Sequence, residues 1–303
     1  MAYATTTQLS NEAKTRSTAD LALQKQIDSL TARVAALENP VVTPPPVVVT
    51  PGPVIRSATS VATLTATASD ETVDIIDCGG LVIGSAVNLR LNRQRPLIVR
   101  NWILDGNGGS TPAISLGTNA GQPGVPTVPT SNISFEDGTV RNIVLGKNGL
   151  LMTGWAEHVA FRRIVATLCS GMGGSYSHVI YAQSDGTHRA KDVTFEDITA
   201  ALDKTMNLMQ LYCSGGPGID GVTFRRVKGT GGHTGFYAYS NSTGITVDDC
   251  EWTDFDQTIE TGETPSGVVG NSVSTRSGPL ALGSGNWKAF SLKDAGTNKG
   301  PLP

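Results

Sequence analysis

Charged residues are scarce in this chain of 303 residues: they make up 16% of it, and the net charge is −3. The sequence lacks the basic excess that attracts nucleic acids and anionic membranes, so we expect neither as a partner. No apolar run approaches the roughly 18 residues that span a bilayer, so no membrane insertion is predicted. The four cysteines form no CxxC pair and no histidine stands at zinc-finger spacing. We therefore predict no metal site and no cofactor.

The first residues, MAYATTTQLSNEAK, lack the basic start and the apolar core of a secretory signal. We expect a protein that is made in the cytosol and leaves it by lysis or as part of an assembly. Cys213 and Cys250 stand in strand-like contexts where a small apolar residue points inward. The cysteines are therefore predicted to be buried free thiols rather than disulfides.

Glycine is abundant, with 35 residues, and threonine, serine, asparagine and valine are frequent, which is a composition typical of strands and turns. Five short stretches share one pattern: apolar, any residue, apolar, then two charged residues. They begin at Ile133, Val159, Val193, Val222 and Ile245. Such alternation is a strand signal, and its recurrence every few tens of residues predicts strands that stack as successive coils.

The charges of these stretches change sign from one copy to the next. Stacked in register, together with an earlier stretch from Leu97, the first column reads Arg100, Glu136, Arg162, Glu196, Arg225, Asp248, and the second reads Asn101, Asp137, Arg163, Asp197, Arg226, Asp249. Neighbouring parallel strands lie about 4.8 Å apart, so opposite charges on adjacent coils attract. We interpret these carboxylates as partners of the arginines that fix the register, not as catalytic groups.

A second set of strand-like runs lies between the charged stretches, from GLLMTG at residue 149 to QTIETG at residue 257. Alternation within the second set predicts an outward strip of aromatic and amide side chains: Tyr181, Gln183, Gln210, Tyr212, Tyr237 and Tyr239. It places inward Ile180, Ala182, Leu211, Cys213, Phe236, Ala238 and Ile259. In the first set, one apolar column is predicted from Val99, Phe135, Phe161, Phe195, Phe224 and Val247.

The N-terminal part predicts a helix from about Leu9 to Glu38, rich in alanine, glutamine, lysine, glutamate and leucine. Apolar residues at the alternating spacing of a coiled-coil seam are Leu23, Ile27, Leu30, Val34 and Leu37. Asn39-Pro40 ends the helix, and residues 40–53 predict an extended proline-rich linker.

The sequence predicts a mainly β body over residues 54–262. Its early part includes a β-type run, ATLTATA, from Ala62, and a long loop is expected over residues 107–131. The pattern is lost after residue 262, so residues 263–303 are predicted to be a terminal cap or tail. Residues 1–8 are short and polar, and we assign them to an N-terminal anchor segment.

Two features of the chain resemble known proteins. The repeated charged stretches resemble the coils of right-handed parallel β-helix proteins with the pectate-lyase-like fold. The helical segment followed by a proline-rich linker resembles the stem of a bacteriophage tail fibre or tailspike. Within it, RVAALE resembles the motif of three-stranded coiled coils, which implies trimerisation through Ile27, Leu30, Arg33, Val34, Leu37 and Glu38.

The resemblance implies a homotrimeric virion appendage that acts outside the cell, is joined to other virion proteins through its N-terminus, and attaches to a bacterial surface polysaccharide. The outward strip is the predicted binding surface, because tyrosine rings stack on sugars and amides read hydroxyl groups. The same strip is equally compatible with packing against a neighbouring subunit. A purely structural fibre is a further alternative, and activity stays open because such folds host lyases, hydrolases and inert adhesins.

The remaining alternative is a polysaccharide depolymerase of the glycoside hydrolase type, which needs two carboxyl groups about 5–9.5 Å apart. The candidate acids are Glu260, Asp254 and Asp256, and Glu260 continues the outward strip by one coil. Enzymatic activity is not the favoured prediction, because acidic loop residues are usually only solvated. The four histidines are expected in solvated turns, and Trp155 and Trp252 are candidates for sugar platforms or for burial at turns.

Overall fold

The computed structural model describes residues 5–38, 52–107, 112–117, 128–145, 148–171, 177–185, 187–213, 216–262, 266–270, 273–275 and 291–294. The chain divides into two units, residues 1–52 and residues 53–303. Residues 40–51 of the predicted linker lie outside the described residues, as do residues 1–4 of the predicted anchor.

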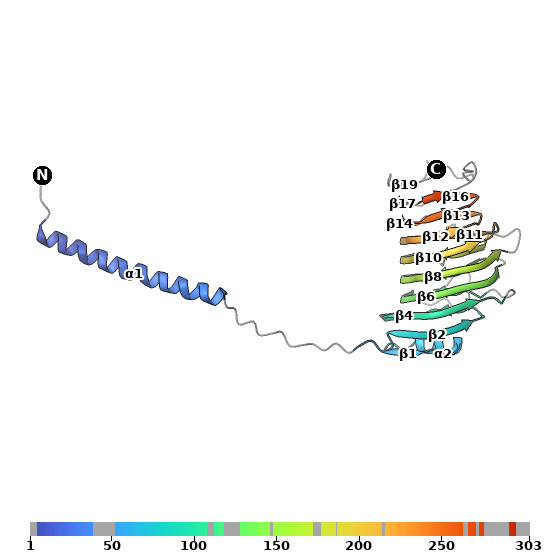
Figure 1. Ribbon diagram of the computed structural model, residues 1–303, viewed down its shortest axis with the longest axis horizontal. Coiled ribbons are helices and arrows are strands. Elements are labelled where there is room, and N and C mark those ends of the chain that lie inside the picture. Colours follow the sequence, from blue (N-terminus) through green and yellow to red (C-terminus); the bar gives the residue numbers. More distant parts are fainter. Residues whose placement is uncertain are drawn as a thin grey trace. The chain divides into compact units, whose positions relative to one another are not determined.

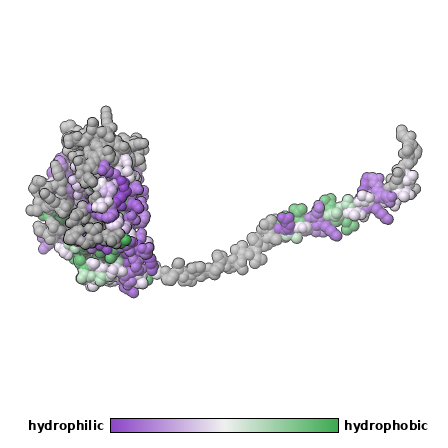
Figure 2. All heavy atoms as spheres, turned by 180° about the vertical axis from the view of Figure 1, so that it is seen from behind, coloured by the Kyte–Doolittle hydropathy of each residue, from purple (hydrophilic) through white to green (hydrophobic). Residues whose placement is uncertain are grey.

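The first unit contains one long helix, α1 (Thr6–Glu38), as the sequence predicted. Its apolar seam is exposed: Leu23, Ile27, Leu30 and Val34 are between 45% and 60% exposed. Figure 2 shows hydrophobic and hydrophilic residues side by side along this helix. The side chains of Leu37 and Glu38 lie outside the described part. A seam of this spacing is typical of helices that pack against further helices.

The second unit is built from two parallel sheets, whose strands lie one above another in Figure 1. The larger sheet, sheet A, has the order β1 (Ile55–Ser57), β2 (Ile75–Ile83), β4 (Asn92–Asp105), β6 (Thr130–Leu145), β8 (Ala156–Gly171), β10 (Ala190–Leu202), β12 (Ile219–Thr230), β14 (Thr243–Asp248), β17 (Ser266–Gly270) and β19 (Ser291–Asp294). Beside β12 lies β15 (Glu251–Thr253), which pairs with β18 (Val273–Thr275).

The smaller sheet, sheet B, has the order β16 (Gln257–Gly262), β13 (Thr234–Tyr239), β11 (Met206–Tyr212), β9 (Ser177–Ala182), β7 (Asn148–Thr153), β5 (Ile114–Leu116) and β3 (Val87–Leu89). From β2 to β17 the chain passes alternately through the two sheets, and we call one such pass a coil. The predicted mainly β class is confirmed, with parallel sheets.

Two strand assignments differ from the sequence prediction. β5 lies within the stretch of residues 107–131 that was expected to be a loop. Parallel pairing also continues past residue 262, because β17 pairs with β14 and β19 pairs with β17. The residues predicted as a cap or tail therefore contribute further strands to sheet A.

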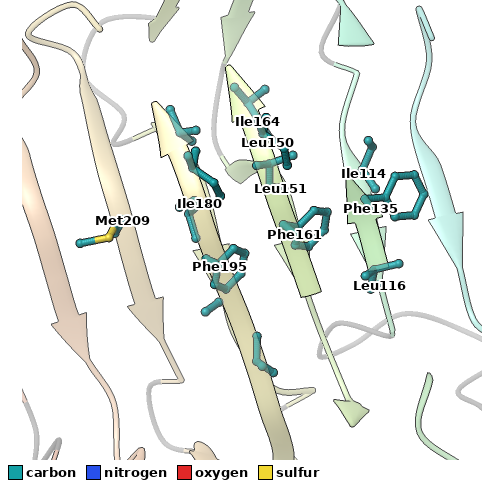
Figure 3. Packing of buried hydrophobic residues seen from close by; sticks show 14 of the residues in the cluster. Ile114, Leu116, Phe135, Leu150, Leu151, Phe161, Ile164, Ile180, Phe195 and Met209 are labelled. Carbon is teal, nitrogen blue, oxygen red and sulfur yellow. The ribbon is translucent and has the colours of Figure 1, made fainter. Parts of the chain in front are cut away.

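The core between the sheets contains the predicted aromatic column. Val99, Phe135, Phe161, Phe195, Phe224 and Val247 are paired in register along sheet A, and each is completely buried. Figure 3 shows Phe135, Phe161 and Phe195 on neighbouring strands. The rings of Phe161 and Phe195 stack at 5.5 Å with an angle of 7° between their planes. Each such side chain contributes about 1.5–3 kcal/mol through burial alone.

One glycine in this core is required by a close approach. Trp102 packs edge-on against Phe135, with ring centroids 5.8 Å apart. A Cβ atom on Gly138, opposite it on β6, would lie 2.1 Å from the Trp102 ring. The next strands carry Ile164 and Ile198 at the position of Gly138. The indole of Trp102 thus takes the volume that isoleucine side chains fill further along the stack.

Sheet A strands bend at residues with positive φ, which recur on successive coils. The first such kink is at Asn132, His158, Asp192, Gly221 and Gly244, and the second is at Asn101, Asp137, Arg163, Asp197, Arg226 and Asp249. The second kink coincides with the second predicted charged column. Asparagine and aspartate tolerate this conformation, whereas it costs other residues about 1–2 kcal/mol each. Arg163 and Arg226 therefore adopt this conformation at a cost in backbone strain.

The predicted charge pairing is confirmed along sheet A. Arg162 lies 3.1 Å from Glu136 and 3.3 Å from Glu196, on the strands to either side. Arg163 and Arg226 pair in the same way with Asp137 and Asp197, at 2.6 Å and 2.5 Å. The register also places Asp77 opposite Arg100, at 3.0 Å, so the alternation begins one coil earlier than the sequence indicated. We call these two columns the charge ladder.

The run ATLTATA forms a helix, α2 (Val61–Ala68), rather than the predicted strand. Ser60 caps it: its side chain accepts from the Thr63 amide, and the Thr63 side chain accepts from the Ser60 amide. Leu64 and Ala68, four residues apart, share the buried face. The far end is closed by the buried guanidinium of Arg93, which donates to the carbonyl oxygens of Ala68, Asp70 and Val73 at 2.7–2.8 Å.

The four cysteines are buried free thiols, as predicted: Cys78, Cys169, Cys213 and Cys250. Burial raises the pKa of the Cys169 thiol to about 12, so it is not a nucleophile at neutral pH. In the described part of the chain, no helix is long and apolar enough to cross a membrane.

Candidate binding strip on sheet B

The predicted outward residues of sheet B form two adjoining columns, which we call the strip. Gln210 is paired in register with Tyr181 on one side and with Tyr237 on the other. Tyr237 is in turn opposite Glu260, so Glu260 continues this column, as predicted. In the second column Tyr212 is opposite Tyr239. Gln183 follows Ala182, the partner of Leu211, and so comes opposite Tyr212.

The strip differs from the prediction in its exposure. Tyr181, Gln183, Tyr212 and Tyr237 are half-buried, and Gln210 is only 6% exposed. The side chains of Tyr239 and Glu260 lie outside the described residues. Alternation along a strand identifies the face that a side chain belongs to, but not whether that face is open. The inward residues of the same strands, from Ile180 to Ile259, are buried as predicted.

Aromatic rings follow one another along the strip. The ring of Tyr181 stacks on that of Tyr212, 6.4 Å away, and on the imidazole of His178, 5.2 Å away. Gly149 makes room for Tyr181, because a Cβ atom on this glycine would lie 2.3 Å from the Cβ of the tyrosine. Burial raises the pKa of Tyr181 above its ordinary value, so its hydroxyl stays protonated.

A buried polar pair supports the strip from one side. His178 is 5% exposed, and its Nδ1 accepts a hydrogen bond from the Asn207 amide at 3.3 Å. Asn207 Oδ1 accepts in turn from the Thr234 backbone N–H at 3.1 Å. Burial lowers the pKa of His178 to about 3, so the ring is neutral at physiological pH. With Nδ1 as acceptor, the ring proton is on Nε2.

Gln210 carries the most informative atom of the strip. Its Oε1 is buried and has no hydrogen-bond partner among the described residues. Leaving such an acceptor unpaired costs about 1–3 kcal/mol. The neighbouring hydroxyl and amide groups of the strip are of the kind that bind sugars. This acceptor is shielded from solvent, so a ligand hydroxyl or amide group reaches it only when the neighbouring half-buried side chains move aside.

The turn after β9 holds an ion pair that sequence reasoning missed. Asp185 is buried, and its carboxylate accepts from the Nδ1 of His188 at 2.7 Å and from the backbone amides of Thr187 and His188. The imidazole of His188 stacks on Trp155, with centroids 3.8 Å apart. Burial pushes the pKa of Asp185 upward, but these hydrogen bonds outweigh it, and the net pKa is lowered. Because Gln183 precedes this turn directly, the stacked pair lies at one end of the strip.

Two of the three acids proposed for hydrolysis, Asp254 and Asp256, lie beside basic side chains, whereas the side chain of Glu260 lies outside the described residues. Lys204 lies 3.6 Å from Asp254 and 3.3 Å from Asp256, and His233 lies 3.3 Å from Asp256. Partial burial raises the pKa of Asp256, but the bonds from His233 and Lys204 outweigh it, so the pKa is lowered overall. A general acid needs the opposite shift. These two residues lie between β15 and β16 and are not part of the strip.

Burial, one of the two alternatives for Trp252, is confirmed, and the expectation for His178 is corrected. Trp252 is completely buried in β15, so it offers no platform to a sugar. His178 is in the middle of sheet B rather than in a solvated turn. His178 stands two residues before Ile180, so alternation along β9 would have placed His178 on the strand. This was the only sequence signal for its position.

Comparisons of the chain with protein-family models, with curated proteins and with solved structures each found no match. In the described ranges, no group of three or more histidine, cysteine, aspartate or glutamate residues is placed to hold a metal ion.

Proposed function

We propose that this protein is a trimeric appendage of a bacteriophage virion that attaches to a bacterial surface polysaccharide. Its body is a right-handed parallel β-helix, and α1 is one strand of a three-stranded coiled coil. The alternation of the chain between two parallel sheets supports the body assignment. The exposed seam of α1, with Ile27, Leu30 and Val34, supports the stem.

The strip is the proposed glycan site, and the unpaired Oε1 of Gln210 is the observation that carries it. Tyr181 and Tyr237 are paired in register with Gln210, and the half-buried Tyr237 ring is the one that contacts a pyranose. When the tyrosines move aside, a sugar hydroxyl or N-acetyl N–H supplies the missing donor. Tyrosine and glutamine give such contacts at a small cost in side-chain entropy.

Attachment without cleavage is favoured by the two candidate acids whose side chains the structure describes. Asp254 and Asp256 share the ammonium group of Lys204, and the pKa of Asp256 is lowered. Hydrolysis of a glycosidic bond requires one of the two carboxyl groups to be protonated. Release of oligosaccharides or of new reducing ends from a bound polysaccharide would instead establish the depolymerase.

The experiment is an adsorption assay of the full chain on immobilised polysaccharides extracted from bacterial envelopes. Tyr212→Ala and Tyr237→Ala are each expected to weaken adsorption about tenfold, which corresponds to the loss of one aromatic stacking contact of about 1.4 kcal/mol. Light scattering should give three times the chain mass of 31.6 kDa for both variants. Thr223→Ala, on the outer face of sheet A, is the control and should adsorb normally. Unchanged adsorption of both tyrosine variants would contradict the proposal.

A further inference from the structure

A second surface of the body is distinct from both the charge ladder and the strip. It consists of outward residues that follow the second kink of β6, β8 and β10, and we call it the neutral face: Thr139, Val165, Thr167, Leu168, Thr199 and Ala201. The charged residues at its borders are already paired. Arg141 lies 2.7 Å from Asp105 and Lys228 lies 3.5 Å from Glu251. None of the six residues of the neutral face is charged, and two of them, Val165 and Leu168, are exposed large apolar residues.

Leu168 is the unusual residue of the neutral face. It is 73% exposed, and its backbone has a φ of 53°. The residues that end the corresponding segments on other coils are Asn142, Gly231 and Asp254, which also have positive φ. Those three types tolerate this conformation, whereas leucine does not. An apolar side chain that is both exposed and strained does nothing for the fold of a single chain, and strain of this kind is typical of functional positions.

Two shallow grooves lie on this part of the body. One, of about 350 Å³, is lined mainly by small side chains such as Val165, Thr199 and Ala201, together with the paired Lys228 and Glu251. The other, of about 410 Å³, is lined by Leu168 itself with Ala201, Leu202 and Asp203. A protruding leucine beside grooves floored by small residues has the shape of a packing surface for another protein surface.

We infer that the neutral face is where a second copy of this chain docks, with Leu168 as its central contact. The inference rests on the trimeric assembly proposed above. Further copies of α1 would bury the exposed apolar seam of α1. Residues 39–51 span at most about 45 Å when fully extended, so copies that share a stem keep their bodies at a high effective concentration.

The charges on sheet A indicate which of its surfaces can contact the same surface of another copy. In neighbouring copies whose stacks lie parallel, equal levels of the stacked coils face one another. On the charge ladder each level has one sign, such as Glu136 with Asp137 on β6 and Arg162 with Arg163 on β8, so equal levels would repel one another. The neutral face carries no charge at the levels of Val165 and Thr167. It is the part of the sheet that tolerates contact with its own copy.

Leu168→Asn tests the inference through the sign of its effect. Asparagine relieves the backbone strain, so it raises the unfolding temperature if Leu168 faces solvent. If Leu168 is buried between copies, the loss of apolar contact dominates. We expect the unfolding temperature of the full chain to fall by about 2–4 °C. The concentration at which the assembly dissociates, measured by light scattering on dilution, should rise at least tenfold.

Two further variants complete the experiment. Thr167→Glu gains Arg141 as a partner within the chain, which preserves the fold, but places like charges on neighbouring copies, so it should promote dissociation. His158→Asn, at the first kink, copies the Asn132 of the preceding coil and should leave dissociation unchanged. A higher unfolding temperature for Leu168→Asn with unchanged dissociation overturns the interface but not the trimer. A monomeric full chain of normal sequence overturns both, while adsorption to glycan is measured independently.

Discussion

Buried polar groups on the outer faces of the two sheets differ in whether they are hydrogen-bonded within the chain. On sheet A the carboxylate of Glu136 accepts hydrogen bonds from Ser134, Arg162 and Arg163, all within the chain. On sheet B the amide oxygen of Gln210 is just as well buried, yet no described residue donates to it. Polar groups that are paired internally fix the register of the coils. The unpaired oxygen of Gln210, left at a cost in stability, is the group that we propose to pair with a ligand.

The comparison predicts that the ladder matters for stability and not for binding. Glu136→Ala removes a buried carboxylate that serves two arginines, and should lower the free energy of unfolding by about 2–3 kcal/mol. Urea unfolding of the full chain measures this loss. Glycan adsorption of the folded variant should be unchanged.

Asp137→Asn is the matched control on the neighbouring column. The Asp137 side chain is 39% exposed, and asparagine tolerates the left-handed backbone conformation. The free energy of unfolding should therefore fall by less than about 1 kcal/mol. A larger loss for Asp137→Asn than for Glu136→Ala would mean that burial is not what makes the ladder stabilising.

The pH dependence of stability tests the burial of His178 in sheet B. The pKa of His178 is about 3 in the folded protein and about 6.5 when unfolded. Between these values the unfolded chain binds a proton that the folded chain does not, so stability falls as the pH is lowered from 6.5. The loss is about 1.4 kcal/mol per pH unit, or about 2 kcal/mol at pH 5.

His178→Gln keeps an acceptor near Asn207 but removes the titrating ring. The difference in stability between pH 7 and pH 5, measured by urea unfolding, should therefore shrink by about 2 kcal/mol in this variant. An equal pH dependence in both proteins would show that His178 is protonated in the folded state, and hence that this part of the strip is open to water.

The sequence was sufficient for features that rest on strict alternation. The aromatic column and the charge ladder follow from the repeated position of Phe135 and Glu136 in each coil, because a parallel stack superposes equal positions. α2 was missed because the threonines of ATLTATA favour strands, and because the capping box of Ser60 uses Thr63 where the usual sequence signature has glutamate or glutamine.

Other features have no signal in a single sequence. The positive φ of Arg163 and Leu168 depends on the kinks of neighbouring coils, and neither residue type indicates that conformation. The burial of Gln210 was missed for a different reason: alternation along β11 predicts its face but not what lies against that face. The unpaired amide oxygen emerged only when the donors around it were known.

The most direct test of the proposed glycan site is Gln210→Met, which keeps the volume of the side chain and removes its amide. Because an unpaired acceptor is lost, the free energy of unfolding should stay the same or rise by up to about 1 kcal/mol. Adsorption to the bacterial polysaccharide should fall at least tenfold. A loss of stability with unchanged adsorption would contradict the account, because it would show that Gln210 serves the fold and not a ligand.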